Sequence, residues 1–134
     1  MSARKPGPIP LCMLLCDSVL EDKKTGKKSL IGMFNGIASA KIPCTHATLC
    51  VFVALTEGNG EYQATLRCVR ADNEEMLLES RGIIRFPGPQ IVLDVNYEIA
   101  SLKLPSYGAY RFDFYCNEDL VISRRFQLTP AEKS

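Results

Sequence analysis

Short segments in which apolar and polar residues alternate are the feature that most constrains how this chain can fold. In "IVLDVNYEI", residues 91–99, an apolar or aromatic side chain occupies every second position. "YRFDFYC", residues 110–116, repeats the pattern with Tyr, Phe, Phe and Cys. A period of two residues is typical of a strand with one buried face, and no stretch shows a helical period of useful length. The sequence therefore predicts an all-β chain.

Turn signals divide the chain into eight expected strands. These strands cover residues 11–20, 28–37, 47–55, 62–69, 76–86, 91–99, 110–116 and 120–128. The first two should form a hairpin around "EDKKTGK", with Gly26 at a positive φ angle, and Asn59-Gly60 suits a tight hairpin turn before the fourth strand. The third strand is apolar on both faces, which predicts a central position, and Gly82 predicts an irregular fifth strand.

The fourth and seventh expected strands indicate which side chains form the core. Because side chains alternate between the two faces of a strand, the apolar residues should share the inward face of each. The inward residues are Tyr62, Ala64, Leu66 and Cys68 in the fourth strand, and Tyr110, Phe112, Phe114 and Cys116 in the seventh.

Eight short antiparallel strands with regular turns predict a two-sheet antiparallel sandwich, with a closed barrel as the alternative. "LKLPSYGAYRFDF", residues 102–114, is similar to the tyrosine corner that opens a late strand in immunoglobulin-like and fibronectin-like sandwiches. In such a corner Tyr107 or Tyr110 would hydrogen-bond a nearby backbone group. We therefore expect an immunoglobulin-like or fibronectin-like sandwich of about eight strands.

The length of 134 residues fits one domain with a single core. Three prolines lie within the first ten residues, which predicts a flexible Pro-rich N-terminal arm over residues 1–10. The expected domain covers residues 11–129, and residues 130–134 form a solvated tail.

The charge of the chain gives little reason to expect a nucleic-acid or membrane partner. The net charge is +1, so no strong field surrounds the whole molecule. Arginines on expected strands could form a basic patch with Tyr115, although Asp94, Glu98 and Asp113 would dilute it. These arginines are Arg67, Arg85, Arg111, Arg124 and Arg125. We therefore expect neither nucleic-acid binding nor membrane association.

The N-terminal segment and the cysteines together predict a cytoplasmic protein. Arg4 and Lys5 precede an apolar stretch, but prolines interrupt it and Asp17 follows closely, which does not match an export signal. In the cytosol the six cysteines should stay reduced, and most should fill the core as small apolar residues. They are Cys12, Cys16, Cys44, Cys50, Cys68 and Cys116.

"CTHATLC" is the segment whose side chains are best suited to metal binding or nucleophilic catalysis. Cys44, His46 and Cys50 have even spacing, so on one strand they could share a face and begin a zinc site. The single histidine of the chain could also activate a thiol nucleophile. However, Cys44 and Cys50 would lie about 20 Å apart along a strand, too far for one ion. We therefore predict no catalytic, cofactor or metal residue, and keep a thiol- or metal-dependent protein centred on these three residues as the alternative.

The first half of the chain resembles a known family. "LLCDSVLEDKKTGKKSLIGMFNGI" and "IPCTHATLCVFVALTEGNGEY", residues 14–37 and 42–62, resemble a family of short, uncharacterised bacterial proteins, a domain of unknown function. The resemblance implies a stand-alone β-sandwich-like domain in the bacterial cytoplasm. It implies no activity, ligand or catalytic residue.

The functional expectation is a non-enzymatic protein-interaction module that uses sheet edges or loops. Strands at a sheet edge have unpaired backbone groups that can bind an extended segment of another chain. The partner would be another protein, or a second copy bound through an edge strand.

The expected redox state can be tested by mass spectrometry. Because the chain has no CxxC pair and no export signal, we expect six free thiols and no native disulfide. Intact mass measured without reductant should equal the sum of the residue masses, whereas a loss of two hydrogens per bridge would contradict the expectation.

Overall fold

The computed structural model describes residues 5–131 and confirms an all-β chain. Residues 1–4 of the predicted arm and 132–134 of the predicted tail lie outside the described residues. The strands are β1 (Ile9–Cys16), β2 (Ser18–Glu21), β3 (Lys28–Ile31), β4 (Gly36–Ser39), β5 (Cys44–Thr56), β6 (Gly60–Arg70), β7 (Met76–Phe86), β8 (Leu93–Leu104), β9 (Gly108–Cys116) and β10 (Asp119–Pro130). The described part of the chain contains no helix long and apolar enough to cross a membrane.

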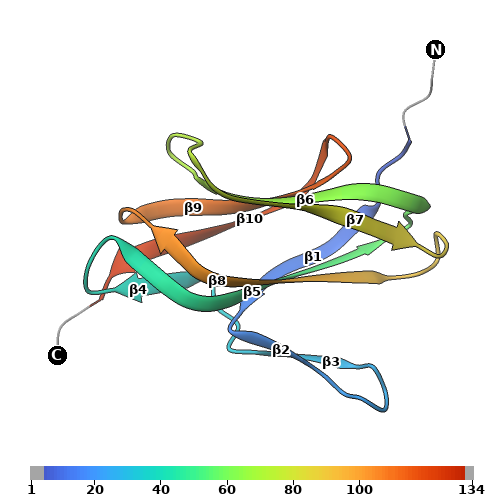
Figure 1. The fold of residues 1–134 in the computed structure, drawn as a ribbon, viewed down its shortest axis with the longest axis horizontal. Coiled ribbons are helices and arrows are strands. Elements are labelled where there is room, and N and C mark those ends of the chain that lie inside the picture. Colours follow the sequence, from blue (N-terminus) through green and yellow to red (C-terminus); the bar gives the residue numbers. More distant parts are fainter. Residues whose placement is uncertain (1–4, 132–134) are drawn as a thin grey trace.

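The strands form three sheets. One has five strands in the order β4-β10-β9-β6-β7, the second has three in the order β1-β5-β8, and β2 and β3 form a separate hairpin. Figure 1 shows the two larger sheets facing each other, with the β2–β3 hairpin projecting away from them. β4 runs parallel to β10, and the other paired strands are antiparallel.

The core lies between the two larger sheets. All eight side chains predicted to face inward from the fourth and seventh strands are buried, which confirms both faces. Phe126 of β10 stacks on Tyr110 and on Phe112 with ring centroids 5.4 Å apart. Leu49 and Val51 of β5 contribute to the core from the opposite sheet. Each large side chain removed from water contributes about 1.5–3 kcal/mol.

The predicted hairpin of residues 11–20 and 28–37 is correct only at its tip. Asp17 interrupts the first strand because its N–H donates to the carbonyl oxygens of Ile31 and Gly32, at 3.0 and 3.1 Å. Only β2 and β3 pair with each other, whereas β1 pairs with β5 and β4 with β10. The two expected strands therefore become four, and residues 5–131 contain ten strands instead of about eight.

The predicted hairpin turn at Asn59-Gly60 is wrong, because β5 and β6 belong to different sheets. The segment between them crosses from one sheet to the other. Gly60 does have a positive φ of 73°. Gly58 lies so close to Phe86 that a Cβ would come within 2.3 Å of its ring, which explains a glycine there.

The expected irregularity at Gly82 is also wrong. β7 pairs continuously with β6 through Gly82, which lies opposite Ala64. The register shifts instead between Cys68 and Val69. The central position predicted for the third strand is confirmed, since β5 lies between β1 and β8.

The ends of the described chain contact the rest of the fold. β1 begins at Ile9, two residues before the predicted start, and Pro8 is buried. The Tyr62 hydroxyl donates to the carbonyl oxygen of Pro6 at 2.9 Å. At the other end, the N–H of Ala131 donates to the carbonyl oxygen of Ser39 at 2.9 Å.

Gly26 allows a test of the hairpin tip. Its φ is 72°, as predicted, and its N–H donates to the carbonyl oxygen of Asp22 at 2.8 Å. Because a β-branched residue is strained at positive φ, Gly26→Val should lower the free energy of unfolding by at least about 1 kcal/mol. Gly7→Val is the matched control, since Gly7 is exposed, has no positive φ and has open space around a Cβ. Urea denaturation showing equal losses for the two variants would contradict this account of Gly26.

Candidate interaction site at the open side of the fold

The side of the molecule formed by β7 and β8 is open. β7 is an edge of the five-stranded sheet and β8 is an edge of the three-stranded sheet, and no ladder joins them among the described residues. The two strands lie on the same side of the molecule, one in each layer (Figure 1). They are 11 and 12 residues long and contain no proline. Both edges therefore retain backbone groups that can pair with another strand.

A hollow of about 380 Å³ lies between the two edges. Leu77 and Leu78 of β7 line one wall, and residues 100–103 of β8 with Pro105 line the other. The two leucines are half-buried and pack against the core. The hollow thus has an apolar floor between two strand edges, which suits an extended apolar segment.

A local irregularity shapes the β8 wall of the hollow. Ser101 has a positive φ of 55°. Ile99 and Leu102, which flank Ala100 and Ser101, both face the core. In a regular strand, side chains three residues apart point to opposite faces. The irregularity therefore leaves Ala100 and Ser101 exposed at the hollow.

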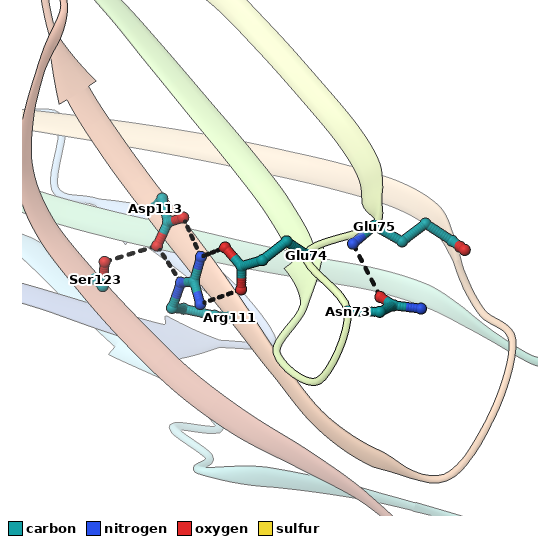
Figure 2. A network of polar contacts seen from close by, with 6 residues as sticks. All are labelled: Asn73, Glu74, Glu75, Arg111, Asp113 and Ser123. Carbon is teal, nitrogen blue, oxygen red and sulfur yellow. Dashed lines mark hydrogen bonds and ion pairs between the residues drawn. The ribbon is translucent and has the colours of Figure 1, made fainter.

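A polar network fixes the turn that leads into β7. Figure 2 shows the guanidinium of Arg111 between the carboxylates of Glu74 and Asp113. Arg111 donates to Asp113 at 2.6 and 2.9 Å and to Glu74 at 2.7 and 2.9 Å, and the Ser123 hydroxyl donates to Asp113 at 2.6 Å. These bonds hold the β6–β7 turn against β9, and the next residue, Glu75, lines the hollow.

The turn itself is closed by backbone bonds. The N–H of Glu74, at a φ of 59°, donates to the carbonyl oxygen of Arg70 at 2.9 Å. The N–H of Glu75 donates to the Asn73 side-chain oxygen at 2.9 Å (Figure 2). The start of β7 is therefore held by both side-chain and backbone contacts.

Asp113 is the buried charge of this network, with 2% of its surface exposed. Burial alone would raise the pKa of its carboxyl, but hydrogen bonds from Arg111 and Ser123 outweigh burial and hold the pKa below its usual range. The hydrogen bonds to Glu74 and Asp113 in turn raise the pKa of Arg111. Asp113 and Arg111 therefore form a stable ion pair at neutral pH.

Three of the other four arginines of the expected basic patch also have a polar partner. Arg67 donates to Glu79 at 2.7 Å and lies over the Tyr115 ring at 4.8 Å, Arg85 pairs with Glu61, and Arg124 hydrogen-bonds Asn35. The hydrogen bond from Arg67 lowers the pKa of the Glu79 carboxyl. The outer face of the five-stranded sheet thus mixes both signs of charge.

Cys44, His46 and Cys50 do not form one cluster. Cys44 and His46 line a hollow of about 400 Å³ near Phe34, whose ring centroid is 5.9 Å from that of His46. Cys50 faces the opposite side of β5, where its thiol donates to the carbonyl oxygen of Asp17 at 3.8 Å. No group of three or more His, Cys, Asp or Glu residues that could hold a metal ion exists among residues 5–131.

Even spacing failed to predict a common face because β5 is irregular between His46 and Leu49. Cys44 packs against the core and so does Leu49, although the two lie five positions apart, which in a regular strand would put them on opposite faces. Ser101 lies opposite this point in β8, so both paired strands change face together. Such a coupled irregularity has no signal in "CTHATLC" itself.

All six cysteines are free, and four of them are buried, as expected of core residues. Burial, with a smaller effect of Asp113, raises the pKa of Cys68 to about 12, and burial also raises that of Cys116 to about 12. Cys16 lies directly opposite Cys50 on neighbouring strands, and burial followed by this neighbour raises its pKa. The buried thiols are therefore protonated and poor nucleophiles at neutral pH.

The energetic role of the polar network can be tested with two variants. Asp113→Ala should lower the free energy of unfolding by about 1.5–3 kcal/mol, because it removes a buried charged hydrogen-bond partner while Arg111, 24% exposed, keeps Glu74. Glu74→Ala should cost less than about 1 kcal/mol, because Glu74 is 63% exposed. Urea denaturation at neutral pH measures both, and equal losses would contradict the role given to Asp113.

The same variant has a predicted pH dependence. Since the pKa of Asp113 is lowered in the folded state, its stabilisation is present above the ordinary aspartate pKa of about 3.9 and is lost as pH falls through the lower folded value. The stability difference between the wild type and Asp113→Ala should therefore narrow below about pH 4. A constant difference down to pH 2 would argue against an ionised Asp113.

Comparison with known families places the chain in one of them. A family of unknown function, DUF6941, matches residues 11–129. The matched span includes nearly all of the ten strands and both walls of the open side. No curated protein matches the chain. The expected resemblance to an uncharacterised domain family is confirmed, and the chain belongs to DUF6941.

Proposed function

We propose that this protein is a non-enzymatic interaction module of the bacterial cytoplasm, and that its open side binds an extended segment of a protein partner. The observation that carries the proposal is the pair of long, proline-free edges of β7 and β8 with an apolar hollow between them. Natural sheets usually cover, shorten or interrupt such edges, because they bind other strands. Strand addition uses the backbone for affinity and the hollow for selectivity.

An immunoglobulin-like assignment of the strands agrees with this proposal. We propose that the fold is a variant of the immunoglobulin-like sandwich, in which β1, β5 and β8 correspond to strands A, B and E, and β6, β9 and β10 to C, F and G. Tyr110 accepts a hydrogen bond from the N–H of Ser106 at 3.2 Å, as expected of a tyrosine corner.

This correspondence explains why β8 is an edge. In a constant-type immunoglobulin domain, strand D lies beside strand E and forms the edge of that sheet. Here residues 87–92 connect β7 to β8 without forming a strand. An added strand from a partner would occupy the place that strand D has in that sheet.

Site-specific photocrosslinking in cells tests the proposal. A photoreactive residue at Leu77 or Lys103, on the two walls of the hollow, should crosslink to a protein, whereas one at exposed Ser29 in β3 should not. The identified partner, once purified, should protect backbone amides of β7 or β8 from hydrogen exchange. Crosslinking at Ser29 but not at Leu77 or Lys103 would contradict the proposal, and so would crosslinking at none of the three.

A further inference from the structure

We propose that the segment bound at the open side is supplied by a second copy of this chain, in a closed dimer. This inference rests on the proposed function and names the partner. In the dimer, β7 of each copy pairs antiparallel with β8 of the other, so that each five-stranded sheet continues into a three-stranded sheet. The result is two continuous sheets of eight strands related by a twofold axis parallel to the strands.

The outer faces of the two edges are complementary in charge. If Phe86 is placed opposite Leu93, the antiparallel register brings Arg85 opposite Asp94 and Arg81 opposite Glu98. The arginines are 71% and 59% exposed and the acidic residues are on the exposed face of β8. Within one chain Arg85 already contacts Glu61 and Arg81 contacts Glu79. Asp94 already contacts Lys28, so the dimer adds a second partner to these charges. Opposite charges placed directly across neighbouring strands stabilise a sheet. Because of the twofold symmetry, each of these charge pairs occurs twice in the dimer.

The inner faces match in the same register. Ile84 lies opposite Val95, and Phe86 lies opposite Leu93, so apolar residues meet on the core side. Tyr97 falls opposite Gly82, which has open space where a side chain would be. One register therefore pairs opposite charges on the outer face and brings apolar residues together on the inner face near Phe86 and Leu93.

The geometry of the single chain agrees with this arrangement. Rotation about an axis parallel to the strands brings the three-stranded layer of one copy beside the five-stranded layer of the other. This rotation leaves the height of every residue along the strand direction unchanged. The hollow already has Leu77 and Leu78 of β7 facing residues 100–103 of β8. Continuing the proposed register from Phe86 and Leu93 brings Leu78 level with Ser101, within this set.

Charge also disfavours the other closed dimer that the open side could form. An axis perpendicular to the sheets would bring β7 beside β7 and β8 beside β8. From Leu93 to Leu102, β8 has two acidic residues, Asp94 and Glu98, and no basic one. That dimer would bring acidic edges together, which is unfavourable.

Charge reversal with rescue tests the inference. The wild type should sediment at high concentration with twice the 14.9 kDa mass of one chain. Arg81→Glu and Glu98→Arg should each raise the dissociation constant of the dimer at least about tenfold, because each dimer then has two pairs of like charges. The double variant should restore dimerisation. Lys23→Glu, at the exposed hairpin tip, is the matched control and should leave the constant unchanged.

The outcomes separate this inference from the proposed function. Circular dichroism and thermal melting should show that all variants remain folded. A wild type that stays monomeric at about 100 µM would overturn the dimer, and so would a dimer that Glu98→Arg does not weaken or the double variant does not restore. If Leu77 still crosslinks to a different protein in those cases, the proposed function stands without the dimer. If neither a dimer nor a crosslink forms, both proposals fail.

Discussion

Aromatic side chains between the two large sheets determine the shape of the open side. Tyr110, Phe112, Phe114 and Phe126 are buried there, and facing sheets packed through such side chains lie about 10 Å apart. Paired strands lie only about 4.8 Å apart. β7 and β8 follow each other in the chain, yet the core keeps them in separate layers. The packing that stabilises the fold therefore also leaves two edges unpaired.

The opposite side of the molecule is closed by a different route. β1 belongs to the three-stranded sheet, and β4 crosses to the five-stranded sheet, where it pairs parallel to β10. β1 and β4 are the sheet edges on that side, and β1 contacts β10 of the other layer. The N–H of Phe34, just before β4, donates to the carbonyl oxygen of Leu15 in β1 at 3.0 Å. On the open side, the Arg111 network holds the turn before β7 without covering its edge. The asymmetry between the two sides gives the open side its proposed role.

Local patterns predicted the strands and their inward faces better than they predicted pairing. The alternation in β6 and β9 correctly gave eight buried residues, because burial of one face produces a period of two. The first hairpin was only partly correct, because the pairing of β4 with β10 joins residues about ninety positions apart and leaves no local signal. Asn59-Gly60 has residue types that suit a hairpin turn. However, packing of the whole core determines which sheet the next strand joins, and β6 joins a different sheet from β5.

The sequence predicted partner binding at edge strands without identifying the edges, and that binding stays a prediction. Edge strands were expected to bind a partner, whereas the identity of the edges depends on strand order, which alternation does not encode. The contact between Arg111 and Glu74 spans 37 residues and was missed for the same reason. Cys44 and Cys50 were considered together because of even spacing, and the irregularity opposite Ser101 separates their faces.

Hydrogen exchange of the edge amides tests the central claim. The claim is that the outer edges of β7 and β8 are unpaired in the single chain, and that β7 of one copy pairs with β8 of the other in a dimer. At dilutions where the chain is monomeric, the amides of β7 and β8 that do not bond to β6 or β5 should exchange rapidly. At dimer concentrations, those within residues 79–86 and 93–100 should become protected together, while the amides of β4 stay unchanged. Protection of both edges at every dilution would contradict the account, because it would mean that β7 and β8 are already paired within one chain.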